Sequence, residues 1–225
     1  MPRTKRVIPP NAALHIICRG NNRQNVFHND NDKLKYYTLL RQWKDHNAVN
    51  ILHYCLMENH IHLILFLNSL SKLSRFMKQV NLSYFHYYKK IYSYFGHLWQ
   101  DRFKSNIIEA DSHLLQCGKY IELNPVRAGI VKHPSEYRFS SYNFYAKGIP
   151  DSLLIQSPAY CGLSDSEESR QQQYVDFVVD RSIINSDLLE KKLYIGSQTF
   201  ISKLQEYYQI NNKRENRGRP SKQEK

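Results

Sequence analysis

The chain has 225 residues, 41% of them hydrophobic, which is enough for one sizeable domain with an ample core and a small appendage. The 32 Lys and Arg outnumber the 20 Asp and Glu, giving a net charge of +12, and 13% of the residues are aromatic. This balance favours a nucleic acid as partner over a merely basic, soluble surface. No apolar run approaches the length of a membrane span, and the sequence opens on no apolar signal segment. We therefore expect a cytoplasmic, nucleoid-associated protein.

The first part of the chain alternates apolar runs with helical patterns. Residues 12–18 read as a strand, and Asp30 is the predicted N-cap of a helix that continues to about residue 45. Residues 50–57 and 60–67 are two apolar runs separated by two polar residues, which predicts a hairpin.

A long helix and a further strand follow. The helix is indicated by apolar and aromatic residues at helical spacing, namely Leu73, Phe76, Met77, Val80, Tyr84 and Tyr88. Residues 99–109 read as one strand or two short ones, and Asp111 caps a helix that Pro125 should end near Asn124. This order of elements predicts an α+β sandwich with a largely antiparallel sheet.

The C-terminal part is less regular. Residues 151–163 are loop-like and residues 164–210 mostly helical, with Phe200, Leu204 and either Tyr207 or Tyr208 on one stripe. From residue 211 the chain is basic and almost free of apolar residues, which predicts disorder in isolation.

Two histidines in the second run of the hairpin point to metal chemistry. His60 and His62 are two residues apart, so in a strand both imidazoles lie on one face. Two neutral imidazoles form half of a metal site, and on their own they suggest zinc or another transition metal. The alternative is a pair of hydrogen-bonded core histidines.

Tyr120 and Asn124 are four residues apart on the predicted helix and therefore share a face. Tyr120 alone carries no signal, because the chain has 17 tyrosines. Combined with a metal at the histidine pair, a tyrosine nucleophile could break a nucleic-acid strand covalently.

Four segments together resemble one known family. They are Arg19-Gly20-Asn21-Asn22-Arg23-Gln24, Asn59-His60-Ile61-His62-Leu63, Leu98-Trp99-Gln100-Asp101-Arg102-Phe103-Lys104 and Tyr120-Ile121-Glu122-Leu123-Asn124-Pro125-Val126-Arg127-Ala128-Gly129. In order and spacing the chain is similar to the REP-associated tyrosine transposases, a branch of the single-tyrosine HUH transposases. The resemblance covers roughly residues 1–145.

The resemblance implies a ferredoxin-like or RRM-like antiparallel sheet with helices on one side, the HUH nuclease core. It divides the chain into a transposase domain at residues 1–149, a small helical extension at 150–210 and a disordered basic tail at 211–225.

The resemblance also implies cleavage and rejoining of single-stranded DNA at palindromic hairpins through a covalent 5′-phosphotyrosine. Tyr120 matches the nucleophile, and His60, His62 and Asn124 match a site for Mg²⁺ or Mn²⁺ rather than zinc. We expect DNA contacts from the matched segments and the tail, specifically from Arg19, Asn21, Asn22, Arg23, Trp99, Gln100, Arg102, Lys104, Arg127, Arg217 and Arg219. Trp99 has packing in the core as an alternative, and for Phe103 we favour the core.

In the tail, Arg217-Gly218-Arg219-Pro220 resembles the core of an AT-hook, which binds A·T minor grooves, with a solvated basic tail as the alternative. Two other functions stay open for the whole chain. One is a non-catalytic nucleic-acid-binding module, and the other is an HUH nickase of the replication-initiator or relaxase type, against which the full set of matched segments argues. We expect a monomer or homodimer.

Overall fold

The structure is a computed structural model that describes residue 9 and residues 12–67, 69–109, 112–180 and 192–209. The predicted cap Asp111, the predicted tail and its Arg217 and Arg219 lie outside these residues. In the described part of the chain, no helix is both long and apolar enough to cross a membrane.

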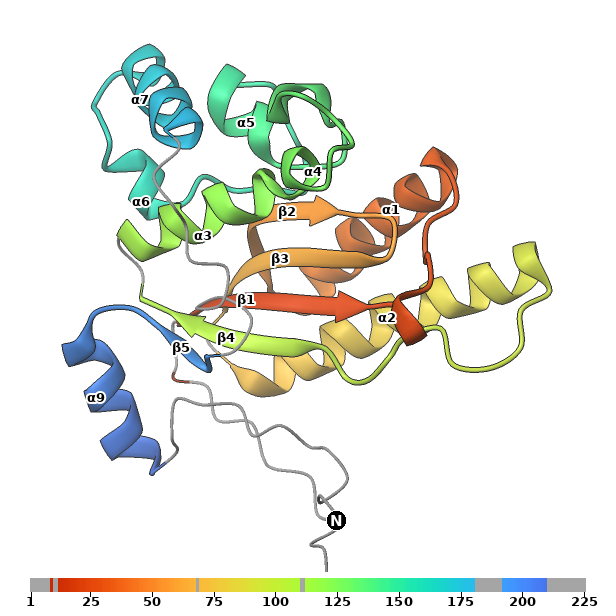
Figure 1. The fold of residues 1–225 in the computed structure, drawn as a ribbon. Helices are drawn as coiled ribbons and strands as arrows, with labels where there is room; N and C mark the ends of the chain where they lie inside the picture. The colour runs from red at the N-terminus through yellow and green to blue at the C-terminus, as the bar shows by residue number, and fades with distance from the viewer. Residues whose placement is uncertain (1–8, 10–11, 68, 110–111, 181–191, 210–225) are drawn as a thin grey trace, which may run out of the picture.

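Five strands form one sheet in the order β2-β3-β1-β4-β5 (Figure 1). The strands are β1 at Ala12–Arg19, β2 at Asn50–Leu56, β3 at His60–Leu67, β4 at Lys104–Ile108 and β5 at Tyr194–Ile195. Every neighbouring pair is antiparallel except β4 and β5, which run parallel. The largely antiparallel sheet predicted from the sequence is confirmed.

Two long helices, α1 at Asp30–His46 and α2 at Leu70–Tyr92, pack against one face of this sheet (Figure 1). The predicted stripe of α2 is buried along its whole length. Between the two helices, the rings of Phe27, Tyr36 and Tyr84 lie 5.2–5.5 Å apart. These tyrosines therefore serve the core, which is how most of the 17 were expected to be used.

The helix α3, at Ser112–Glu122, packs on the opposite face of the sheet. Asn81 of α2 reaches Cys18 of β1 on the first face, whereas Gly118 of α3 lies over His53 of β2. Successive strand residues point to opposite faces, and the register places Cys18 and His53 on opposite faces of the sheet. The expected placement of the helices on one side of the sheet is therefore wrong, because α1 and α2 cover one face and α3 the other. Since both faces are covered, β1 and β3 are buried almost throughout, which explains their nearly uninterrupted apolar sequence.

Most predicted elements are found with small differences at their ends, but the strand expected over residues 99–109 is confined to Lys104–Ile108. The N-cap of α1 is Asn29 and not the predicted Asp30, because the Asn29 side chain accepts a hydrogen bond from the backbone N–H of Asp32. The carboxylate of Asp32 in turn accepts from the N–H of His28. The first bond satisfies a backbone donor that the first turn of a helix leaves exposed, and the second ties the preceding residue to that turn.

From residue 164 the described C-terminal part is mostly helical, as predicted, and it also supplies the edge strand β5. Its helices are α7 at Glu167–Val179 and α9 at Gln198–Tyr208. A short helix, α6 at Pro158–Cys161, was not predicted, because residues 151–163 were expected to be loop-like. Helix α9 buries Ile201, while Tyr207 of the predicted stripe is exposed. Strand β5 was not predicted, because two residues are too few to show a strand period.

Helices α6 and α7 gather with α5, at Tyr142–Lys147, beyond the β2 edge of the sheet (Figure 1). Together with Leu115 of α3 they form a second hydrophobic cluster that contains Tyr142, Tyr145, Tyr160 and Tyr174. The second cluster is thus built directly onto α3.

Candidate active site

The two histidines of β3 lie where the strand alternation places them, on one face of the sheet. Their ring centroids are 4.9 Å apart and the rings are nearly perpendicular. In the register with β1, His62 lies opposite Ile17 and His60 opposite Arg19. His62 is buried with 1% of its surface exposed, and His60 is half-buried near the end of the sheet.

A third histidine, which the sequence reading missed, stands beside this pair. Nε2 of His15, on β1, lies 2.8 Å from Nδ1 of His62, and the two rings stack with centroids 5.0 Å apart. Only one signal in the sequence pointed to it, a lone histidine in the middle of an apolar strand. That signal could not be used without knowing that β1 is the neighbour of β3.

Tyr120 of α3 faces the same two histidines. Its ring centroid is 6.0 Å from that of His62 and 6.4 Å from that of His15, with both pairs in edge-to-face geometry. This approach depends on Gly118, because a Cβ at that position would lie 2.6 Å from Cε1 of His53. The structure therefore brings together Tyr120 and His62, which are far apart in the sequence. Tyr120 itself is 4% exposed.

Asn124 lies just beyond α3, at the start of the short helix α4, Asn124–Arg127. Its side-chain nitrogen donates to the carbonyl oxygens of Tyr120 and Ile121, at 3.1 and 3.2 Å. The polar contacts of Asn124 are thus with the end of α3 and not with His60 or His62. Because its nitrogen is used in this way, the side-chain oxygen is the atom that could act as a ligand.

Arg127, which was predicted to contact DNA, lies over the ring of Tyr120. Its guanidinium is 4.9 Å from the centre of the Tyr120 ring, and its Nη1 donates to the Tyr120 carbonyl at 3.2 Å. A cation over the face of an aromatic ring is attracted by the ring quadrupole. Arg127 therefore places a positive charge against the Tyr120 ring.

Both histidines of the pair are kept neutral. Burial lowers the pKa of His60 to about 4, helped by the charge of Arg19. Burial also holds the pKa of His62 well below 6.5, with smaller contributions from His60, His15 and Arg19. Neutral imidazoles have the lone pair that a metal ligand needs.

Two imidazoles lie together at this position, while Asn124 is bonded through its side-chain nitrogen to the end of α3. Nδ1 of His60 is 2.5 Å from the side-chain oxygen of Asn59, which leaves Nε2 as its ligand atom. Within the described residues no group of three or more His, Cys, Asp or Glu side chains is arranged to hold a metal. The residues present therefore fit an open site, in which water and a phosphate would complete the coordination, and not a closed structural one.

The two other segments of the predicted DNA surface meet beside the histidine pair. The N–H groups of Gly20 and Asn21 donate to the carbonyls of Asn59 and Leu98, both at 2.8 Å, and the N–H of Gln100 donates to Arg19 at 2.9 Å. These bonds join the loop after β1, the β2–β3 turn and the segment before β4.

The predicted DNA-contacting side chains in these segments differ in exposure. Arg19 and Asn21 are half-buried, and the exposed ones are Asn22, Arg23, Gln100, Arg102 and Lys104. Trp99 is partly buried against Tyr36 and Tyr84, while Phe103 belongs to the core as favoured.

Trp99 and Arg102 also line a groove of about 570 Å³ that runs between α2 and residues 96–103. Lys78, Phe85 and His97 are among its other lining residues. None of the residues that line this groove is His60, His62 or Tyr120, so the groove is separate from the tyrosine site.

The sequence profile of one family, described as "Transposase IS200 like", matches residues 10–124, slightly more than half of the chain. The chain belongs to the IS200-like transposase family. The matched region contains β1, the histidine pair, Tyr120 and Asn124. The transposase family predicted from the motifs is thereby confirmed. No curated protein sequence matches this transposase.

Two solved structures are similar to the transposase. One is a REP-associated tyrosine transposase bound to a REP hairpin, with 20% identity, a TM-score of 0.51, and coverage of 69% of this chain and 92% of the other. The other is a candidate transposase from Deinococcus radiodurans R1, with 16% identity, a TM-score of 0.37, and coverage of 60% and 98%. The first similarity supports the predicted fold of the HUH core.

Proposed function

We propose that this transposase cleaves and rejoins single-stranded DNA at hairpins through a covalent 5′-phosphotyrosine formed on Tyr120. The observation that carries the proposal is the ring of Tyr120, which lies 6.0 Å from that of His62 and beside the pair of neutral histidines. A hairpin as substrate is supported by the REP hairpin bound in the structure of similar fold.

In the proposed reaction the phenol oxygen of Tyr120 attacks the scissile phosphorus and loses its proton. The bond from phosphorus to the 3′ oxygen breaks, and the leaving oxygen takes up a proton to become a 3′-hydroxyl. Because the link to tyrosine conserves the phosphodiester, a 3′-hydroxyl can attack it in the reverse sense and join strands without ATP.

His60, His62 and Asn124 are the residues that would hold a divalent cation, Mg²⁺ or Mn²⁺. Such a cation would offset the negative charge that develops on the scissile phosphate. Asn59 fixes the ring of His60, and His15 fixes the ring of His62. These partners orient both imidazoles before any substrate arrives.

Basic side chains near this site would bind the DNA backbone. In the sheet register Arg19 lies opposite His60. Ile17 of β1 lies between two partners, with His62 opposite it on β3 and Lys104 opposite it on β4. Residues directly opposite one another point to the same face, so Lys104 is exposed on the histidine face. Arg127 is exposed and lies over the Tyr120 ring, where its guanidinium could bind a phosphate beside the nucleophile.

The nucleophile is tested by Tyr120→Phe, which removes one oxygen and keeps the ring. The chain is incubated with labelled hairpin oligonucleotides and Mg²⁺ or Mn²⁺, and the covalent product is followed as a band that survives denaturing electrophoresis. We expect the band from wild type and from the control Tyr207→Phe, whose side chain is 79% exposed, but not from Tyr120→Phe. A band from Tyr120→Phe would assign the reaction to another tyrosine. No band from wild type on any hairpin would favour the non-catalytic binding module.

The metal ligands are tested in the same assay. His60→Ala and His62→Ala should each abolish cation-dependent cleavage while hairpin binding persists. Asn124→Ala should do less harm, because water can replace one oxygen ligand. Full activity in excess EDTA, or in the double histidine variant, would show that the pair is structural. Cleavage of origin sequences but not of hairpins would favour a replication-initiator type of nickase.

A further inference from the structure

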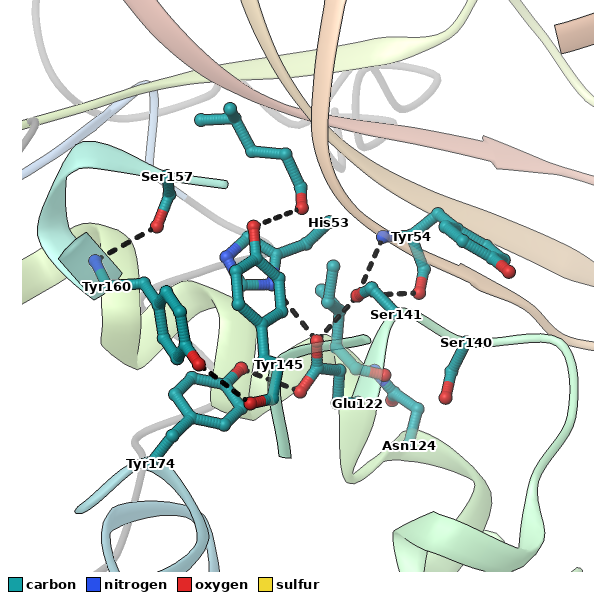
Figure 2. A network of polar contacts seen from close by, with 12 residues as sticks. His53, Tyr54, Glu122, Asn124, Ser140, Ser141, Tyr145, Ser157, Tyr160 and Tyr174 are labelled. Atoms are coloured by element: carbon teal, nitrogen blue, oxygen red, sulfur yellow. Dashed lines mark hydrogen bonds and ion pairs between the residues drawn. The ribbon is translucent and has the colours of Figure 1, made fainter. Parts of the chain in front are cut away.

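Glu122, the last residue of the tyrosine helix α3, is fully buried and is bonded from three sides (Figure 2). Its carboxylate accepts hydrogen bonds from Oγ of Ser141 at 2.5 Å and from the hydroxyl of Tyr174 at 2.7 Å. Nδ1 of His53 lies 3.0 Å from the same carboxylate. We call these four residues the Glu122 network.

The position of Glu122 makes these partners necessary. A carboxylate at the C-terminal end of a helix lies near the negative end of the helix dipole. Its burial is also unfavourable unless its oxygens are hydrogen-bonded. The network therefore compensates for a charge placed where neither the helix nor the solvent stabilises it.

The partners of Glu122 come from elements that are distant in the sequence. His53 belongs to β2, Ser141 precedes α5, and Tyr174 lies in α7 of the predicted C-terminal extension (Figure 2). Burial and the nearby Glu122 raise the pKa of Tyr174 well above 10, so its hydroxyl stays protonated and donates. The extension thus supplies a donor to the helix that carries Tyr120.

His53 contacts α3 at two places. Its ring lies under Gly118, and its Nδ1 meets Glu122 one turn later. On the other side the ring stacks on Tyr145 of α5, with centroids 4.4 Å apart. Among the described residues its Nε2 has no hydrogen-bond partner, so Glu122 is its polar contact there.

These contacts bracket Tyr120. Gly118 lies two residues before it and Glu122 two residues after it, and both are held by groups outside α3. We propose that Tyr174 and Ser141, acting through Glu122, set the depth at which α3 lies on the sheet and thereby place Tyr120 against His62. Residues 141–179, which include Ser141 and Tyr174, are then a positioning element of the cleavage site and not a separate module. The inference rests on the proposed function of Tyr120.

Two buried tyrosines of the second cluster provide a matched test. Tyr174→Phe removes the hydroxyl that bonds Glu122, whereas Tyr160→Phe removes one that bonds the backbone carbonyl of Tyr145 at 3.0 Å. Both side chains are about equally buried, with 0% and 1% of their surface exposed. Tyr160→Phe therefore controls for the loss of a buried tyrosine hydroxyl from this cluster, and any additional effect of Tyr174→Phe reports the loss of a donor to the Glu122 carboxylate.

The full-length variants are compared in two measurements. The first is the rate of covalent product formation at saturating hairpin DNA, together with the Kd for that DNA. We expect Tyr174→Phe to lower the rate by about tenfold or more at unchanged Kd, because small misplacements of a reacting group are costly. Tyr160→Phe should keep the wild-type rate.

The second measurement, hydrogen–deuterium exchange of the α3 peptide, needs no activity. Exchange there should increase in Tyr174→Phe and not in Tyr160→Phe. Equal rates and equal exchange in the two variants would overturn the positioning role. If wild type forms no covalent product, the proposed function fails, and the exchange comparison alone decides whether α7 holds α3.

Discussion

Nε2 of His15 lies 2.8 Å from Nδ1 of His62, so one strand of the sheet orients the metal-ligand candidate on its neighbour. This bond leaves Nε2 of His62 as the atom able to take a ligand. Nε2 of His62 has a lone pair for a metal only when the shared proton is on Nδ1 of His62, because a neutral imidazole has one donor and one acceptor nitrogen.

We expect His15→Ala to weaken Mn²⁺ binding by about tenfold or more, which is the usual effect of losing a partner that orients a metal-bound histidine. The measurement is an Mn²⁺ titration followed by electron paramagnetic resonance. His15→Gln, which retains a polar side-chain end, should recover part of the affinity, and His46→Ala, on an exposed residue of α1, should have no effect. Unchanged affinity in His15→Ala would make the contact a packing interaction.

Gly118→Ala should destabilise the protein by about 1–3 kcal/mol, because overpacking a filled core forces neighbours to shift. The new Cβ would lie 2.6–3.0 Å from three atoms of the His53 ring. Gly162→Ala is the control, since its nearest neighbours would be at an ordinary 3.5 Å. The free energies of unfolding come from denaturant titrations. Equal effects of the two substitutions would mean that α3 can move away from the sheet at little cost.

Much of this site could be predicted because it follows from local periods. The period of two in β3 places His60 and His62 on one face, and the helical period places Asn124 one turn after Tyr120. Neither period says that α3 crosses the sheet above His62. That contact depends on the strand order and on Gly118, which the sequence shows only as a glycine within a helix.

The contributions of His15, Arg127 and Glu122 could not be predicted for a related reason. Each acts through a partner 7 to 52 residues away, namely His62, Tyr120 and Tyr174. Arg127 was expected to contact DNA, and Glu122 had no expected role. The sequence alone does not show whether a charged residue in a motif binds a ligand or another side chain. Only the folded contacts distinguish the two cases: Glu122 is fully buried, whereas Arg127 is exposed and still packs on the Tyr120 ring.

Stability should fall as the pH is lowered through the histidine range. The pKa of His60 is about 4 in the folded protein and near 6.5 in the unfolded chain, so between these values the unfolded state binds more protons. His62, with a pKa also held below 6.5, acts in the same direction. Unfolding titrations across this window should show stability rising with pH, with a smaller slope in the His60→Ala, His62→Ala double variant. An unchanged slope would assign the effect to other groups.

Hairpin binding should weaken steeply with salt, because binding releases counterions from the DNA with a slope of about −0.7 per phosphate neutralised on a single strand. Lys104→Ala should reduce this slope by about the contribution of one phosphate, since its exposed side chain lies on the histidine face. Affinities measured over a range of salt concentrations provide the test. A flat dependence in wild type would contradict an electrostatic role for the +12 charge.

Arg127→Gln should slow formation of the covalent product and shift its pH–rate profile to higher pH. The guanidinium lies 4.9 Å from the centre of the Tyr120 ring, and a nearby positive charge favours the negative charge that the phenol oxygen acquires as it attacks. Without it, a higher pH should be needed for the same rate.

Arg127→Lys keeps the charge but loses the planar group. Its pH–rate profile should stay near that of wild type, and its rate should fall less than that of Arg127→Gln. Hairpin Kd values measured in parallel separate this effect from weaker DNA binding. If both variants lose affinity and neither profile moves, Arg127 acts on the DNA alone, as the motif first indicated. If the glutamine variant shifts the profile at unchanged Kd, the guanidinium acts on the nucleophile.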